Sequence, residues 1–263
     1  MRAKKHLGQN FLSGGQFIQT IVSSANISKN DTVLEIGPGK GVLTRELLKY
    51  AKKVVCVEKD ADLIPLLSET FAEEIQSGRL EIIEGDIIDL LSAEQTFIKS
   101  PYKVVANIPY YITGILLRLL LSAHNQPASI TLVVQKEVAE RIVSRDKKES
   151  ILSLSVKAYG VPTYIQKIPA RYFNPKPKVD SAIIHIGGIS RAAFSSPAEE
   201  DLFFNIMKAG FAHKRKLLAG NLSDTYGKET VRELFITCAI PEKARAEDLP
   251  LEKWLCLTQT HRL

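Results

Sequence analysis

Hydrophobic and polar positions alternate in blocks along the first two thirds of the chain. Five short apolar runs each end in polar residues or glycine, and segments with helical apolar spacing separate them. The runs predict strands at 31–36, 53–57, 80–83, 104–106 and 130–134. The segments between these runs predict helices. One follows the first strand and ends at about residue 50, and the others cover 61–75, 112–122 and 136–145. Strands alternating with helices predict an α/β fold with a doubly wound sheet, which binds ligands at the carboxyl ends of its strands.

The pattern changes after Gly187 and Gly188. Further strands are expected near 151–159 and 179–186, but 198–257 carries only helical periodicity. The sequence therefore predicts a first domain over 1–188 and a small all-helical C-terminal domain over 189–263.

Composition places the chain among globular proteins of one large and one small domain. It has 263 residues, 45% hydrophobic and 24% charged, and no apolar run approaches the roughly 20 residues of a membrane span. The N-terminus lacks the apolar region of a signal peptide. Cys56, Cys238 and Cys256 have neither zinc spacing nor the pattern of a disulfide framework, and Cys56 is expected to be a small buried hydrophobe. These features predict a cytosolic, reducing compartment, no membrane association and no metal site.

The net charge of +6 is concentrated in one segment. Residues 136–178 hold ten Lys or Arg against four Asp or Glu, an excess equal to that of the whole chain. A solvated face is the simpler interpretation of any single lysine here. For the cluster as a whole, a nucleic acid partner is favoured.

Candidate ligand-binding residues follow successive strands. The loop Gly37-x-Gly39-x-Gly41 lies between a strand and a helix, where glycines let a ligand approach backbone N–H groups. Val42 occupies the position at which a dinucleotide fingerprint requires Gly or Ala, which argues against NAD. Glu58, at the end of the second strand, is placed to accept hydrogen bonds from two ribose hydroxyls, and Asp86, after the third, from an adenine amine.

A nucleoside bound without an obvious pyrophosphate cradle fits S-adenosylmethionine. The glycines could instead be turn residues, and Glu58 or Asp86 could be helix N-caps. For Asp86 alone, the cap and the ligand are equally good interpretations. For the ordered set of residues at successive strand ends, the ligand interpretation is favoured.

The fourth strand ends in an unusual stretch, Asn107-Ile108-Pro109-Tyr110, before a helix begins. Ordinary strand-to-helix turns use small polar residues and glycine. An amide, backbone carbonyls and an aromatic ring together suit a site that binds a planar amine and stacks on its ring. We therefore expect the Asn107 oxygen and the carbonyl of Ile108 or Pro109 to accept hydrogen bonds from the exocyclic amine of adenine, a poor nucleophile whose lone pair they would direct.

The chain resembles the bacterial small-subunit rRNA adenine dimethyltransferases, which are related to the macrolide-resistance rRNA methylases. The resemblance covers essentially the whole chain. Its motifs are 6–12 (HLGQNFL), 34–39 (LEIGPG), 57–60 (VEKD), 85–86 (GD), 107–113 (NIPYYIT), 135–142 (QKEVAERI) and 173–181 (FNPKPKVDS). The motifs at 107–110 and 173–181 together are highly specific, whereas the glycine loop alone is not.

The resemblance implies a Rossmann-like, class I S-adenosylmethionine-dependent methyltransferase sheet. It implies dimethylation of the N6 amines of two adjacent adenosines in the hairpin loop near the 3′ end of small-subunit (16S) rRNA, within the immature 30S subunit, by a cytoplasmic monomer. Tyr110 and Phe173 would sandwich the target adenine, and the basic run His213–Lys216 is a candidate contact to rRNA. The residues implied at the cofactor are Asn10, Leu12, Gly37, Gly39, Glu58, Asp86 and Asn107, and at the reacting adenine Asn107, Ile108, Pro109, Tyr110 and Phe173.

Three alternatives share parts of this pattern. A DNA adenine methyltransferase, or another on a small substrate, would have the same sheet and cofactor site. A large-subunit rRNA methylase conferring macrolide resistance fits the forms of 135–142 and 173–181 less well. A non-catalytic RNA-binding assembly or transcription factor would bind cofactor without transferring a methyl group, which the intact Asn107–Tyr110 motif disfavours.

Overall fold

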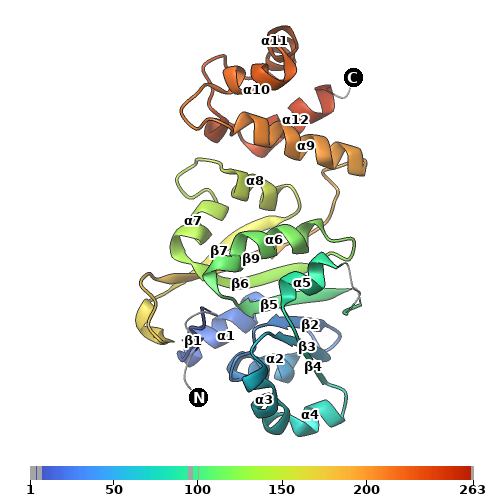
Figure 1. Cartoon of the computed structure of the whole chain (residues 1–263), viewed down its shortest axis with the longest axis vertical. Coiled ribbons are helices and arrows are strands. Elements are labelled where there is room, and N and C mark those ends of the chain that lie inside the picture. The colour runs from blue at the N-terminus through green and yellow to red at the C-terminus, as the bar shows by residue number, and fades with distance from the viewer. Residues whose placement is uncertain (1–3, 5–7, 94–96, 100, 262–263) are drawn as a thin grey trace. The chain divides into compact units, whose positions relative to one another are not determined.

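The computed structural model describes residue 4 and residues 8–93, 97–99 and 101–261. Two compact units make up the chain (Figure 1). The sheet unit comprises Met1–Ala139 and Val161–Ile189, and the helical unit comprises Glu140–Gly160 and Ser190–Leu263. The segment 140–160 thus groups with the helical unit, whereas the sequence pattern assigned it to the first domain.

The sheet unit is built on a mixed sheet, which confirms the predicted α/β class. Within the described residues seven strands pair in the order β4-β3-β2-β5-β6-β9-β7. The first five in this order are parallel, and β9 and β7 are antiparallel to their neighbours. The strands are β2 (Thr32–Ile36), β3 (Lys53–Glu58), β4 (Leu80–Glu84), β5 (Tyr102–Asn107), β6 (Ser129–Gln135), β7 (Val161–Ile168) and β9 (Ser181–Gly187).

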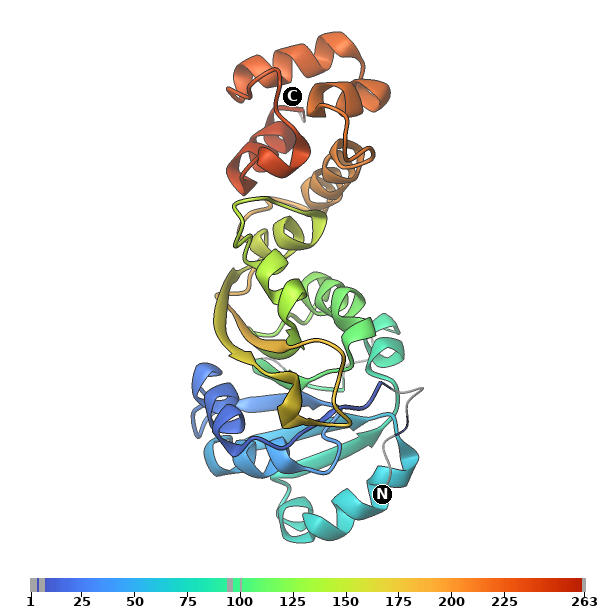
Figure 2. The ribbon, with the colours of Figure 1, turned by 90° about the vertical axis from the view of Figure 1, so that its left-hand side faces the viewer.

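Helices cover both faces of this sheet, so its central strands are apolar at consecutive positions. Val33 and Leu34 of β2 point to opposite faces, and both are fully buried. Figure 2 shows α1 and α2 on one side of the sheet and α5 and α6 on the other. The helices of this unit, with α7 crossing into the helical unit, are α1 (Gly15–Ser24), α2 (Val42–Tyr50), α3 (Ile64–Thr70), α4 (Ala72–Gln76), α5 (Ile87–Ser92), α6 (Thr113–Ser122) and α7 (Lys136–Ile142).

Short elements complete the sheet unit near the strand ends. The strand β1 (Phe11–Leu12) pairs antiparallel with β8 (Phe173–Asn174) apart from the main sheet. Single 3-10 turns are η2 (Ala61–Leu63), η3 (Tyr110–Ile112) and η4 (Ala170–Tyr172). These turns link the ends of β3, β5 and β7 to the elements that follow.

The strand expected near 151–159 is wrong, because the structure has a helix, α8 (Ile151–Lys157), at that place. The alternating apolar residues imitate a strand, but Ser150 caps the helix by accepting the Ser153 N–H at 3.1 Å. The strand β7, which follows, was not predicted. It is an edge strand that contains Pro162, and all its residues but one are exposed or half-exposed, so its apolar pattern is weak.

The described residues of the helical unit contain helices and no strand. Trp254 is its buried centre, with its ring stacked on Phe211 at 5.4 Å between centroids and its indole N–H donating to the Leu249 carbonyl at 3.2 Å. The elements are α8, α9 (Pro197–Gly210), α10 (Leu218–Tyr226), α11 (Lys228–Thr237), η5 (Ala246–Asp248) and α12 (Leu251–His261).

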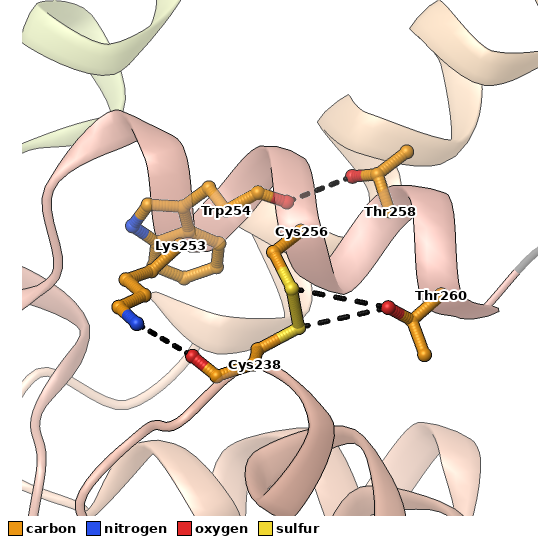
Figure 3. Close-up of a disulfide and its surroundings, with 6 residues drawn as sticks. All are labelled: Cys238, Lys253, Trp254, Cys256, Thr258 and Thr260. Carbon is orange, nitrogen blue, oxygen red and sulfur yellow. Dashed lines mark hydrogen bonds between the residues drawn. A yellow bond between two sulfur atoms is a disulfide. The ribbon is translucent and has the colours of Figure 1, made fainter.

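A disulfide joins Cys238, at the end of α11, to Cys256 in α12 (Figure 3). The expectation that the cysteines form no disulfide was therefore wrong for this pair, because helix packing brings together two cysteines that are 18 residues apart in sequence. Lys253 donates to the Cys238 carbonyl at 2.6 Å beside the bridge. Cys56 is a buried free thiol in β3, as expected.

Neither a membrane span nor a metal cluster is found in the part of the chain that the structure describes. No described helix has the length and apolar character needed to cross a bilayer. No group of three or more described His, Cys, Asp or Glu side chains is arranged to hold a metal ion.

Candidate active site

A cavity of about 370 Å³ opens at the carboxyl ends of the parallel strands in the sheet unit. Its volume is in the range of small-molecule and cofactor sites. Its floor comes from the segments that follow β2, β3, β4 and β5, and residues 8–13, here called the strap, form another wall. The predicted residues that line it are Asn10, Leu12, Gly37, Gly39, Glu58, Asp86, Asn107, Ile108 and Pro109.

The glycine loop after β2 is bound directly to Glu58. Gly37 and Gly39 both have positive φ, near +66° and +61°, which L side chains rarely adopt. The Gly39 N–H donates to Glu58 Oε2 at 3.1 Å, and the Asp60 N–H donates to Oε1 at 2.8 Å. Burial raises the pKa of Glu58, while these N–H donors act in the opposite direction. The loop thus fixes a carboxylate that lines the cavity and can accept further hydrogen bonds.

Asp86 serves as a helix cap and also lines the cavity. Its Oδ1 accepts the Ile88 N–H at 2.9 Å at the start of α5, and Oδ2 pairs with Lys59 Nζ at 2.7 Å. Burial opposes ionisation, but the bonds from Lys59 and Ile88 lower the pKa of Asp86 below its usual value. The cap interpretation of Asp86 is therefore confirmed, and its place in the cavity keeps it available to a ligand.

The Asn107 amide is oriented by the strap. Its Nδ2 donates to the Asn10 carbonyl at 3.0 Å, and the Asn10 side chain in turn donates to the Gly8 carbonyl at 3.1 Å. Because the donor end of the Asn107 amide points to the strap, the opposite end, Oδ1, is the acceptor presented to a ligand. Asn107 ends β5, so the sheet and the strap together determine its position.

The two tyrosines of the motif differ in accessibility. The Tyr110 hydroxyl lies 2.6 Å from Ser181 Oγ of β9, and the Tyr110 carbonyl accepts the Thr113 hydroxyl at 3.0 Å. Tyr110 is half-buried and is not part of the cavity wall, whereas Tyr111 is 63% exposed and is part of it. The sequence reasoning missed Tyr111, although an aromatic residue directly after the motif was a visible signal.

The structure does not bring Phe173 to the cavity. Phe173 is 4% exposed and belongs to the hydrophobic core of the sheet unit. It is buried because β8 pairs with the strap, which sets Phe173 opposite Leu12 in the register. The role of Phe173 as a second ring over the target base stays a prediction, which its buried position does not support.

A buried acid that the sequence reasoning did not assign also lines the cavity. Glu35 lies in β2, is 1% exposed, and burial raises its pKa to about 7. The thiol of Cys56 donates to Glu35 Oε2 at 3.4 Å. A glutamate between apolar neighbours in a strand that is covered on both faces was the signal that could have identified it.

The basic segment 136–178 is divided between the two units, so it is not shown to be one continuous surface. Several of its side chains are also paired within their own unit, among them Arg145 with Glu140, Lys157 with Glu149, and Lys167 with Asp180. The loop His213–Lys216 of the helical unit is exposed, and Lys216 pairs with Asp224 at 2.7 Å.

Comparisons with known proteins point to one family. A family model described as "Ribosomal RNA adenine dimethylase" matches residues 1–261. A protein of Dehalococcoides mccartyi named "Ribosomal RNA small subunit methyltransferase A" is 40% identical over 99% of this chain and 89% of its own length. A protein of Fusobacterium nucleatum with the same name is 38% identical over 96% of this chain and 95% of its own.

Solved structures show the same fold over nearly the whole chain. A dimethyladenosine transferase from Plasmodium falciparum is 27% identical with a TM-score of 0.78, over 96% of this chain and 97% of that one. The 23S rRNA methyltransferase ErmE is 25% identical with a TM-score of 0.78, over 97% of this chain and all of its own. The fold is therefore that of the Rossmann-like methyltransferases. The chain belongs to the family of ribosomal RNA adenine dimethylases, which are S-adenosylmethionine-dependent enzymes.

Proposed function

We propose that this protein dimethylates the N6 amines of two adjacent adenosines in the hairpin loop near the 3′ end of small-subunit rRNA. The relatives named for the small ribosomal subunit support this choice of RNA. The observation that carries the proposal is the orientation of Asn107, whose Oδ1 acceptor faces a cofactor-sized cavity because its Nδ2 is bound by the strap.

The residues of the cavity fit S-adenosylmethionine. Glu58 offers carboxylate oxygens for the ribose hydroxyls, and Asp86 offers one for the adenine amine. Gly37 and Gly39 let a ligand approach the backbone, while Asn10 and Leu12 close the cavity from the strap. When bound there, the cofactor supplies an electrophilic methyl group, and the protein supplies position and electrostatics.

At the target, we assign Asn107 Oδ1 and the carbonyl of Ile108 or Pro109 as acceptors for the two N–H groups of the adenine amine. These bonds favour a pyramidal nitrogen whose lone pair points at the methyl group. No general base is needed before attack, because the proton leaves only after the nitrogen has become cationic. Tyr110, fixed by Ser181, is the ring assigned to the target base.

The exposed ring of Tyr111 at the cavity wall is assigned to a base beside the target. An RNA hairpin loop offers bases that are already partly unstacked, and each base stacked on an aromatic ring contributes about 1–3 kcal/mol. The helical unit, with its exposed His213–Lys216 loop, is assigned to the rRNA backbone. We expect a cytoplasmic monomer that acts on the immature 30S subunit.

A labelled-methyl assay on immature small subunits, naked rRNA and DNA tests the proposal. We expect transfer to the small subunit, with dimethyladenosine at two adjacent positions detected by mass spectrometry of nuclease digests. The Asn107→Ala variant should lose transfer and keep its fold by circular dichroism.

Each other outcome supports a different function. Transfer to DNA or to large-subunit rRNA would replace the substrate we propose. Cofactor binding without transfer to any of the three would indicate an RNA-binding assembly factor. Near-normal turnover by Asn107→Ala would contradict the mechanism.

A further inference from the structure

Asp60 is a buried carboxylate that none of the roles above uses. It follows β3, two residues after Glu58, and its side chain is only 2% exposed. A carboxylate removed from water in this way must be matched by donors. Lys4 Nζ donates to its Oδ1 at 2.5 Å, and Gln9 Nε2 donates to its Oδ2 at 2.8 Å.

A local role does not account for these partners. Asp60 caps the turn η2 through Oδ1, which accepts the Asp62 N–H at 3.2 Å. That cap leaves Oδ2 unexplained, and Oδ2 is the oxygen that Gln9 reaches across 51 residues of sequence. Asp60 therefore binds the N-terminal segment as well as its own turn.

The strap continues directly from this anchor to the reacting group. Gln9 is followed by Asn10, whose carbonyl accepts the Asn107 amide at 3.0 Å. Phe11 then packs against Gly39, where an added Cβ would lie 2.9 Å from its ring, and Lys40 Nζ lies 5.2 Å from the ring centroid. The strap ends in the pairing of β1 with β8. It thus has anchors at both ends, and the Asn107 contact lies between them.

We infer that Asp60 is a positioning residue for methyl transfer: by holding Gln9 and Lys4 it fixes the strap over the cofactor and thereby sets the Asn10 carbonyl that orients Asn107. The inference rests on the proposed function for the role of Asn107. A second consequence concerns the cofactor alone, because the strap forms a wall of its cavity.

The neighbouring Asp62 provides a matched control. Asp62 also pairs with Lys4, at 2.6 Å, but its side chain is 62% exposed, and it is not part of the cavity wall. Asp62→Asn removes one carboxylate from the same lysine without touching Gln9. Asp60→Asn removes the buried charge that Lys4 and Gln9 share.

The first experiment measures cofactor dissociation without RNA, by stopped-flow displacement of S-adenosylmethionine from the full chain. A lost hydrogen bond to a charged group corresponds to roughly a 10- to 100-fold change, and we expect dissociation from Asp60→Asn to quicken by this factor. Asp62→Asn should match the parent protein. Hydrogen exchange in residues 8–13 should quicken in the Asp60 variant alone.

The second experiment measures methyl transfer in single turnovers at saturating cofactor, with the active fraction set by cofactor stoichiometry. Asp60→Asn should lower the rate and leave more monomethylated product, and Asp60→Glu should restore part of the rate. Combining Asp60→Asn with Gln9→Leu should be no worse than Asp60→Asn alone, because both changes release the same contact. Additive effects of the two changes, or dissociation and transfer rates equal to those of Asp62→Asn, would overturn the inference.

The two proposals fail in distinguishable ways. If the rRNA substrate is wrong, the parent protein transfers no methyl group, yet the difference in cofactor dissociation remains. If the Asp60 role is wrong, the parent protein methylates rRNA and the dissociation rates coincide.

Discussion

The carboxyl group of Glu35 makes the stability of the sheet unit depend on pH. In the folded chain burial raises its pKa from the ordinary 4.5 to about 7. The folded state therefore holds the proton more tightly than the unfolded chain does. Between these two values the folded state is the more protonated one, so stability falls as the pH rises, and the loss is complete above about 7.

The magnitude follows from the shift. Since one pKa unit corresponds to about 1.4 kcal/mol, the rise from 4.5 to about 7 makes ionised Glu35 cost about 3 kcal/mol of folding free energy. Glu35→Gln keeps the shape of the side chain and removes the titration. Part of this cost is already present at pH 5, which lies above the unfolded value of 4.5, so the stability of the variant relative to the parent should be greater at pH 8 than at pH 5 by about 2.5 kcal/mol. Any constant cost of placing an amide beside Cys56 cancels in this comparison.

Hydrogen exchange of the backbone amides of β2 measures this difference in stability in the sheet unit alone. Parent and variant are compared at the same pH, so the intrinsic exchange rate cancels, and urea unfolding gives an independent value. A relative stability that is the same at pH 5 and pH 8 would refute the reasoning, because it would mean that Glu35 titrates alike in the folded and unfolded chains.

Three further results are expected. Glu58→Ala should raise the cofactor Kd roughly 10- to 100-fold, through loss of hydrogen bonds to a charged group, and unchanged affinity by calorimetry would remove Glu58 from the site. The logarithm of the RNA binding constant should fall linearly with the logarithm of the salt concentration, and replacing Lys214 and Arg215 by Ala should reduce the slope by about 1.5. A binding constant that does not change with salt in filter binding would contradict the phosphate contacts. Cys256→Ser or a reductant should lower the stability of the helical unit by about 3 kcal/mol. Urea unfolding followed by the fluorescence of Trp254, the one Trp of the chain, measures this change. An unchanged unfolding midpoint would show that the disulfide adds no stability.

The strand ends of the site could be located from the sequence. Apolar runs that stop at Glu58, Gly85 and Asn107 determine where the parallel strands end, and the structure gathers the residues at these ends around one cavity. Strand periodicity carries this information because a buried strand must be apolar along its length.

Pairings between distant segments could not be located in this way. Phe173 is buried because β8 pairs with the strap, and Cys238 meets Cys256 because α11 packs beside α12. Glu35 gains its unusual pKa only from the neighbours that bury it. Each of these depends on contacts between elements, which local patterns do not encode.

Because the helical unit is assembled from two separate stretches of the chain, it cannot be removed or isolated by a single cut. Within this unit the Tyr159 carbonyl accepts the Ser190 N–H at 2.9 Å, and its ring packs against Phe194 and Phe204. A fragment beginning at residue 189 would lack Tyr159 and the helix α8 before it. A chain truncated at the same place would keep Tyr159 and α8 on the sheet unit without their partners, which would leave their apolar side chains exposed to solvent. Domain-swap chimeras between relatives should therefore exchange 140–160 together with the C-terminal segment.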